Sequence, residues 1–128
     1  MKVLLDTHTL LWAVFNPKKL SRRVANIIDD KSGVMLVSAA SAWEIATKVR
    51  LGKLPGAEVF ERDFLQNLDA LGYALLSIDA ETALRASRFT AVHGDPFDRM
   101  IAAQALALDI PVISLDTKLD QFGVRRIW

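Results

Sequence analysis

The sequence predicts an α/β fold in which a parallel sheet of four to five strands carries helices on both faces. Short apolar runs of strand length, such as residues 3–5 and 34–37, alternate with longer segments whose apolar residues recur at helical spacing. The strands are continuous apolar runs, without the alternation typical of a sheet that faces water on one side. Strands of this kind, separated by helices, indicate a parallel sheet covered on both faces.

The length and composition agree with a single domain over residues 1–128. Of the 128 residues, 52% are hydrophobic, and a chain of this length buries roughly two thirds of its unfolded surface. The absence of cysteine excludes disulfides, thiolate metal sites and a cysteine nucleophile. The longest stretch without a charge has 12 residues, whereas a membrane-spanning helix needs about 20. Asp6 interrupts the first apolar run, so we expect no signal peptide. Together these observations predict no membrane contact and a cytoplasmic location.

The expected elements are, in chain order, a strand at 3–5, helices at 7–15 and 22–30, a strand at 34–37, helices at 41–51 and 58–71, a strand at 73–76, helices at 80–89 and 96–108, and strands at 111–115 and 124–127. The first helix stops before Pro17, because proline cannot continue a helix. Ser21 and Asp79 fit the N-caps of the helices that follow them. Gly52 and Gly72 fit the left-handed residue that commonly follows a helix.

Carboxylates follow two of the predicted strands. Asp6 stands where the first strand ends and Asp116 just past the fourth, and Glu44 comes one helical turn after the exit of the second strand. In an open α/β sheet, ligands bind beyond the carboxyl ends of the strands. We therefore expect these three residues to gather at one edge of the sheet. Asp98 begins the helix before the fourth strand, and spacing alone does not place it relative to that edge.

Carboxylates held close together repel one another. At an effective dielectric near 20, two charges about 4 Å apart cost on the order of 4 kcal/mol. Either some of the carboxylates stay protonated or a cation offsets their charge. With oxygen ligands only, the cations that fit are Mg²⁺ and Mn²⁺.

Each carboxylate also has a purely structural interpretation. Asp6 fits an N-cap and Asp116 a turn residue. The segment from Ser41 to Glu44 has the spacing of a capping box, which by itself favours a structural role for Glu44. Asp95 precedes Pro96, so Asp95 fits an N-cap and Asp98 the first helical turn, where acids favour the helix dipole. These local rules leave both interpretations open.

Four motifs, taken in order, resemble a PIN domain. They are Asp6-Thr7 after a strand, Ser38-x-x-Ser41-x-x-Glu44-Ile45, Asp95-Pro96-Phe97-Asp98-Arg99 before an alanine-rich helix, and Ser114-Leu115-Asp116. The sequence is most similar to VapC-type toxins of bacterial type II toxin–antitoxin pairs. The resemblance extends from residue 3 to the C-terminal segment, and the Asp-Pro-Phe-Asp-Arg motif is its most specific part.

The resemblance implies an endoribonuclease in which water, activated by Mg²⁺ or Mn²⁺, attacks an RNA phosphodiester. By position, the catalytic quartet is Asp6, Glu44, Asp98 and Asp116. The resemblance implies that Asp6, Asp98 and Asp116 bind the metal and that Glu44 acts through a water. It therefore favours a role in the site for Glu44 over the structural role that the capping box suggests. Auxiliary candidates are Thr7, Asp95, Arg99 and Asp120.

The resemblance also implies an RNA substrate, a cognate antitoxin and a homodimer, with DNA bound only through the antitoxin. The net charge of +1 means that any attraction to RNA comes from local patches. Candidate RNA contacts are Lys48, Arg50, Lys53 and Lys118, although each also fits a solvated helix face. Arg99 adjoins Asp98 and is expected to pair with phosphate or with a carboxylate of the quartet.

The remaining candidate functional residues are aromatic residues and histidines. Trp12, Phe15 and the 58–71 helix are expected, by the resemblance, to line a groove that holds the antitoxin. His8 and His93 receive no catalytic role, because a lone histidine is usually structural.

Two other functions compete with the nuclease. A phosphoacceptor receiver domain shares the size, the α/β pattern, the acids at strand ends and Mg²⁺. It expects an acidic pair after the first strand and an aspartate after the third, where this chain has Asp6-Thr7 and Leu76-Ser77. The second alternative is a PIN domain that acts mainly as a co-repressor bound to its antitoxin.

Overall fold

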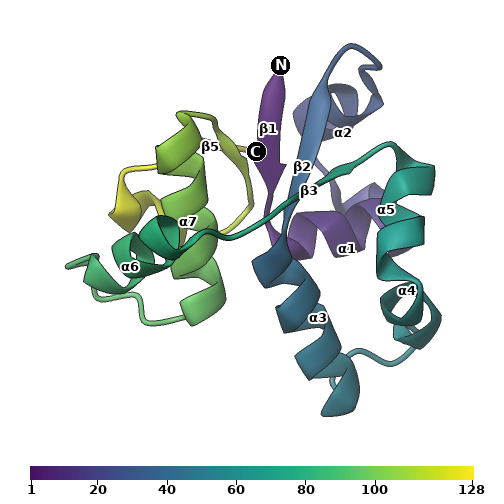
Figure 1. Ribbon diagram of the computed structural model, residues 1–128. Helices are drawn as coiled ribbons and strands as arrows, with labels where there is room; N and C mark the ends of the chain where they lie inside the picture. Colours follow the sequence, from purple (N-terminus) through teal and green to yellow (C-terminus); the bar gives the residue numbers. More distant parts are fainter.

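The computed structural model describes residues 1–128 and contains a five-stranded sheet in the order β3-β2-β1-β4-β5 (Figure 1). The strands are β1 (Lys2–Leu5), β2 (Val34–Ser38), β3 (Ala74–Leu76), β4 (Val112–Ile113) and β5 (Arg126–Ile127). Every pairing between neighbouring strands is parallel. The predicted parallel sheet is therefore confirmed, with five strands.

Seven α-helices and two short 3-10 helices connect the strands. They are α1 (Thr7–Phe15), η1 (Pro17–Lys19), α2 (Arg22–Asp29), α3 (Ala39–Arg50), α4 (Glu58–Arg62), α5 (Phe64–Leu71), α6 (Ala80–Arg88), α7 (Pro96–Leu108) and η2 (Thr117–Phe122). The longest, α7, has 13 residues. No helix combines the length and the apolar character that crossing a membrane requires.

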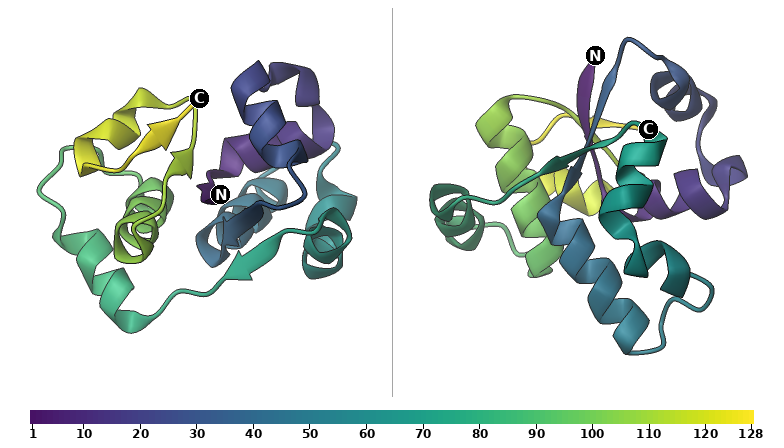
Figure 2. Two further views of the ribbon diagram at one scale, coloured as in Figure 1. Left: turned by 90° about the horizontal axis from the view of Figure 1, so that it is seen from above. Right: turned by 45° about the vertical axis from the view of Figure 1, so that its right-hand side comes forward.

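The central strand β1 sends alternate side chains to opposite faces of the sheet, and each face has its own core. Val3 and Leu5 pack in a cluster with residues of α1 to α5. Leu4 packs on the other face with Ile101 of α7 and Leu119 of η2. Figure 2 shows α6 and α7 on one side of the sheet and α1, α2 and α5 on the other. Helices therefore cover both faces, as the continuous apolar strands predict.

The strand order places a topological switch point at β1. From β1 the chain moves outward to β2 and β3, then returns through α6 and α7 to place β4 on the opposite side of β1. The backbone N–H of Asp6 donates to the carbonyl of Ile113 at 3.1 Å, which joins the ends of β1 and β4. Crevices at such switch points are the usual ligand sites of open α/β sheets.

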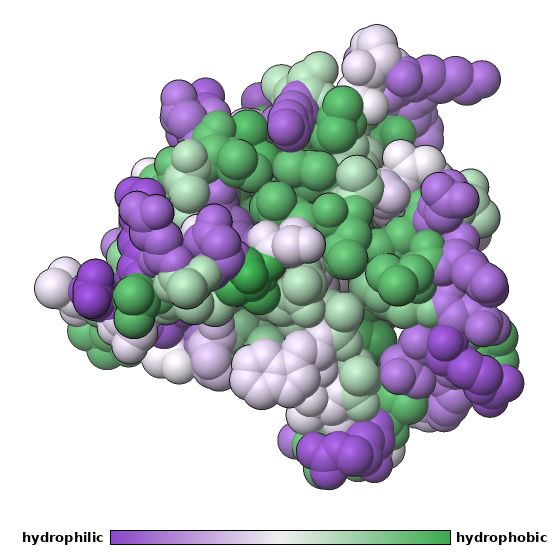
Figure 3. All heavy atoms as spheres, in the orientation of Figure 1, coloured by the Kyte–Doolittle hydropathy of each residue, from purple (hydrophilic) through white to green (hydrophobic).

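The edge strand β3 is the least buried part of the sheet. Ala74 and Leu75 are exposed and Leu76 is only half-buried. Figure 3 shows apolar side chains across the middle of this view, with hydrophilic side chains around them.

Four predicted elements differ from the structure by more than one residue at an end or by a break. The expected 58–71 helix is two helices, because Asp63 leaves helical geometry with φ −109° and ψ 37°. Helix α3 begins at Ala39 instead of Ser41, because the Ser38 hydroxyl accepts from the Ala40 N–H at 2.9 Å and caps the helix there. The expected strands at 111–115 and 124–127 are two residues long each.

Candidate metal centre

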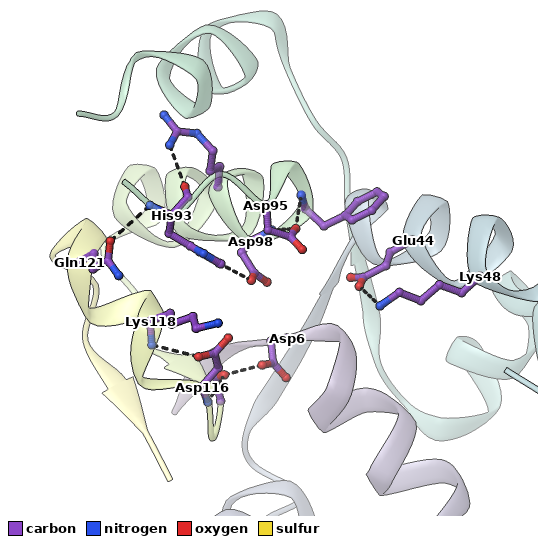
Figure 4. A network of polar contacts seen from close by, with 12 residues as sticks. Asp6, Glu44, Lys48, His93, Asp95, Asp98, Asp116, Lys118 and Gln121 are labelled. Atoms are coloured by element: carbon purple, nitrogen blue, oxygen red, sulfur yellow. Dashed lines mark hydrogen bonds and ion pairs between the residues drawn. The ribbon is translucent and has the colours of Figure 1, made fainter. Parts of the chain in front are cut away.

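A polar pocket of about 180 Å³ lies beyond the carboxyl ends of β1 and β4, and all four residues of the predicted quartet line it (Figure 4). We call it the acidic pocket, lined by Asp6, Thr7, His8, Glu44, Lys48, His93, Asp95, Asp98, Asp116 and Lys118. The carboxylates reach it from the end of β1, from α3, from the start of α7 and from the segment after β4. The strand-end rule thus places Asp6, Asp116 and Glu44 together, and the fold adds Asp98.

Asp6 is buried at the floor of the acidic pocket, with 5% of its surface exposed. One carboxylate oxygen accepts from the Thr9 N–H at 2.7 Å and caps α1, and the other accepts from the Ser114 hydroxyl. Burial raises the pKa of the Asp6 carboxyl above its ordinary value, although these hydrogen bonds oppose the shift. Asp6 therefore caps α1, as its structural interpretation predicts, and it also lines the acidic pocket.

Asp98, Asp116 and His93 form the most compact group of metal-ligating side chains. Each offers one ligand atom, and the three atoms lie within 4.8 Å of one another. The Nε2 atom of His93 lies 2.8 Å from Oδ2 of Asp98. Burial raises the pKa of the Asp98 carboxyl, the charges of Asp95 and Glu44 add to the rise, and the contact with His93 opposes it.

Glu44 lies inside α3, buried, with its side chain directed into the acidic pocket (Figure 4). Lys48, one turn later, donates to Glu44 Oε2 at 2.5 Å. The predicted capping box is wrong, because Ser38 is the N-cap and the Ser41 hydroxyl instead contacts the Thr7 hydroxyl at 2.9 Å. Glu44 therefore caps nothing.

The charge of the acidic pocket suits a divalent cation. Five carboxylates line it, from Asp6, Glu44, Asp95, Asp98 and Asp116, against two lysines, Lys48 and Lys118. The raised pKa values of Asp6 and Asp98 show that these carboxylates ionise at a cost when no cation offsets them. Carboxylate oxygens suit Mg²⁺ and Mn²⁺. Asp98 and Asp116 are placed to hold such an ion, with Asp6 beside them.

A family model described as the PIN domain matches residues 3–124. The chain belongs to the PIN-domain family. This membership confirms the family named from the four motifs and leaves the receiver-domain alternative without support.

Other proteins resemble this PIN domain in part of the sequence or in fold. Over 60 residues it is 45% identical to ribonuclease VapC16 of Mycobacterium tuberculosis, a stretch that spans 46% of this chain and 43% of that relative. Its fold resembles a chain of Rickettsia felis VapBC2 bound to a promoter DNA fragment, with a TM-score of 0.72, 12% identity, and coverage of 99% and 98%. A chain of Haemophilus influenzae VapBC-1 gives a TM-score of 0.68 at 18% identity, with coverage of 99% and 97%. At these identities the likeness shows the fold.

The auxiliary candidates of the PIN domain lie in different places. Asp95 caps α7 by accepting from the Phe97 and Asp98 N–H groups at 2.9 and 3.1 Å, and it also lines the acidic pocket. The expected pairing of Arg99 with a quartet carboxylate is wrong, because its guanidinium donates to five backbone carbonyls of residues 86–93. Asp120 lies outside the pocket and accepts from Arg126 at 2.9 Å.

Two histidines that were given no role, His8 and His93, line the acidic pocket, and of these His93 contacts a quartet carboxylate. For His93 the only available signal was its position five residues before Asp98, in the segment that leads into α7. That spacing gives no direction for the imidazole, because residues 89–95 belong to neither helix.

Four of the six candidate binding residues line at least one of two hollows. Lys48 and Lys118 line the acidic pocket, whereas Arg50 and Lys53 do not. Trp12 and Phe15 line a second hollow of about 320 Å³, which we call the apolar groove, together with Thr7, His8, Leu11, Lys48, Leu54, Pro55, Gly56 and Ala57. The 58–71 segment was expected here, but the residues directly before it form that wall.

Proposed function

We propose that this PIN domain is a Mg²⁺- or Mn²⁺-dependent endoribonuclease and the toxin of a type II toxin–antitoxin pair. The observation that carries the proposal is the acidic pocket at the switch point, where Asp98 and Asp116 offer ligand atoms within 4.8 Å of each other. The relative named a ribonuclease and the resemblance to chains of VapBC complexes support it.

The pocket residues divide the proposed hydrolysis among them. A divalent ion bound here would supply Lewis acidity and would lower the pKa of a coordinated water. Asp98, Asp116 and Asp6 would hold the ion, while Glu44, on the opposite side of the pocket (Figure 4), would orient the attacking water and accept its proton. No side-chain nucleophile is required.

Two lysines of the acidic pocket are proposed to bind the phosphate of the RNA. Lys48 and Lys118 are the cations that line the acidic pocket. Their ammonium groups are point charges suited to the non-bridging oxygens of an RNA phosphate. This role is proposed for Lys48 and Lys118 and not for Arg50 or Lys53, which lie outside the pocket.

The proposed antitoxin occupies the apolar groove. The groove and the acidic pocket share Thr7, His8 and Lys48, so a segment seated against Trp12 and Phe15 extends to the mouth of the acidic pocket. Occupation of the groove would therefore block access of RNA. We also propose a homodimer, a cytoplasmic location and contact with DNA only through the antitoxin.

RNA cleavage with Mg²⁺, with Mn²⁺ and with EDTA tests the proposed nuclease. We expect cleavage with either metal, none with EDTA, and a loss in Asp98→Asn that exceeds the about 10–100-fold typical of residues that only support a metal ligand. The matched control is Asp69→Asn, an exposed aspartate on α5, which should cleave like the parent. Undiminished cleavage in EDTA or in Asp98→Asn would contradict the proposal.

A further inference from the structure

The segment that connects α6 to α7 is folded around the guanidinium group of Arg99. Arg99 donates from Nε to the carbonyl of Ala86 (2.9 Å), from Nη1 to Ala91 (3.2 Å) and His93 (2.9 Å), and from Nη2 to Ser87 (3.2 Å) and Phe89 (2.6 Å). A guanidinium has five N–H donors. All five donors of Arg99 therefore bond to backbone carbonyls, two in the last turn of α6 (Ala86 and Ser87) and three in this segment.

Further contacts hold the segment where it meets η2. The guanidinium carbon of Arg99 lies 5.8 Å from the ring centre of Phe89 and 5.9 Å from that of Phe122. The imidazole of His93 lies 5.9 Å from the same Phe122 ring. The backbone N–H of His93 donates to the Gln121 side chain at 3.3 Å. The backbone N–H and C=O groups of His93 are thus both hydrogen-bonded, which fixes the backbone position from which its side chain extends.

From that place the imidazole reaches the acidic pocket. His93 Nε2 lies 2.8 Å from Asp98 Oδ2 (Figure 4), and the two side chains are 15% and 23% exposed. A hydrogen bond to a carboxylate requires that Nε2 carry the proton, so this nitrogen has no lone pair left for a metal. The bond involves one oxygen of Asp98 and leaves the other oxygen available.

We propose that His93 is a positioning residue that orients the Asp98 carboxylate toward the bound metal, and that Arg99 holds His93 in place. This inference rests on the proposed function. Residues that bind metals are generally held by hydrogen bonds from a second group, which fix the ligand and tune its basicity. Arg99 thus acts on the metal site through the backbone of its connecting segment, although its own side chain contacts no carboxylate.

Calorimetric titration with Mn²⁺ alone tests the role of His93 without RNA. We expect His93→Ala to bind Mn²⁺ about 10–100-fold more weakly than the parent. His93→Gln should recover most of the affinity, because its amide N–H sits near the position of imidazole Nε2. Thermal melting of the metal-free variants checks that both fold. Unchanged affinity in His93→Ala, or equal losses in the two variants, would overturn the proposal.

Pulsed electron paramagnetic resonance of bound Mn²⁺ separates positioning from direct ligation. With His93 as a positioning residue, the spectrum shows no coupling to a directly bonded nitrogen. Strong nitrogen coupling that disappears in His93→Ala would make His93 a ligand and overturn the proposal. A parent protein that binds no Mn²⁺ would instead overturn the proposed function itself.

A double-mutant cycle tests the part assigned to Arg99. Lysine keeps the charge but cannot donate to five carbonyls, so Arg99→Lys should weaken Mn²⁺ binding. If Arg99 acts through His93, Arg99→Lys causes little further loss in the His93→Ala background. Fully additive losses would show that Arg99 acts independently of His93 and would overturn this part.

Discussion

The carboxylate of Asp6 caps helix α1 and borders the acidic pocket at the same time. Its two oxygens accept from the Thr9 N–H and the Ser114 hydroxyl, and burial raises the pKa of the group. A raised pKa in the folded state means that ionisation of Asp6 opposes folding. With respect to Asp6, the free energy of unfolding is therefore largest below the unfolded pKa of about 3.9, where the carboxyl is protonated. This stabilisation is lost as the pH rises through the folded pKa of Asp6.

The variant Asp6→Asn should therefore be more stable than the parent at neutral pH when no metal is present. Asparagine keeps an acceptor for the Thr9 N–H and has no charge to bury. Between mildly acidic and neutral pH, the parent should lose more stability than the variant, because the variant has only the raised pKa of Asp98 and the parent has those of both Asp6 and Asp98. Denaturant unfolding in EDTA at the two pH values measures this difference. Equal losses of stability in the two proteins would contradict the account.

Site residues whose positions depend on the neighbouring sequence could be predicted from that sequence. Site residues whose positions depend on tertiary packing could not. Asp6 and Asp116 follow from the rule for strand ends, whereas Asp98 came from the family resemblance because helix packing sets its position. Arg99 was misplaced because adjacent residues on a helix do not face each other. Asp98 faces the acidic pocket, so Arg99 points to the connecting segment instead.

At the scale of elements, the start of α3 is tied to two other parts of the chain. The buried Ser38 hydroxyl accepts from the Ala40 N–H and donates to Gln104 Oε1 of α7 at 2.5 Å. The side-chain amide of Gln104 donates to the Ser77 carbonyl at 3.2 Å. These bonds join β2, α3, α7 and the segment after β3, and so hold Glu44 opposite Asp98.

Ser38→Ala should lower the free energy of unfolding by about 2–3 kcal/mol, because it removes a cap and leaves the buried Gln104 oxygen without its donor. The matched control is Ser21→Ala at the half-buried cap of α2, where the serine accepts from the Val24 N–H at 3.1 Å. We expect a loss of about 1 kcal/mol there. Denaturant unfolding measures both, and a loss at Ser38 no larger than at Ser21 would be inconsistent with this network.

The elements themselves were mostly predictable, and their boundaries were less so. Ser21 and Asp79 cap helices as predicted, because capping depends on neighbouring residues alone. The break at Asp63 was missed, because no proline or glycine marks it and Asn67 compensates by donating to the Phe60 carbonyl. The start of α3 was misplaced because Ser41 was taken as the cap, whereas the Ser38 hydroxyl caps the helix and the Ser41 hydroxyl contacts Thr7 of α1.

At the scale of the whole molecule, the parallel sheet places the acidic pocket and the apolar groove side by side. Both share Thr7, His8 and Lys48, and the groove extends over α1 toward Phe15. The lysines and carboxylates of the pocket also make a net charge of +1 compatible with the proposed RNA substrate. A bound divalent ion would offset the carboxylates, and Lys48 and Lys118 would then be available to the phosphate.

Phe15→Ala should weaken binding of the cognate antitoxin by about tenfold or more, because buried aromatic anchors dominate such interfaces. Phe15 is half exposed in the free chain and packs edge-on against Phe60 with ring centres 5.7 Å apart. The control is Trp43→Ala, an exposed aromatic residue outside the groove, which should bind like the parent. Calorimetry measures both affinities. A larger loss in Trp43→Ala than in Phe15→Ala would place the antitoxin on another surface.

The proposed function depends on the acidic pocket being a divalent-metal site. Anomalous diffraction from a crystal of the protein soaked in Mn²⁺ locates the ion. We expect an anomalous peak inside the pocket, contacted by carboxylate oxygens of Asp98 and Asp116, that disappears in Asp98→Asn. Anomalous peaks found only outside the pocket, or none at saturating Mn²⁺, would contradict it.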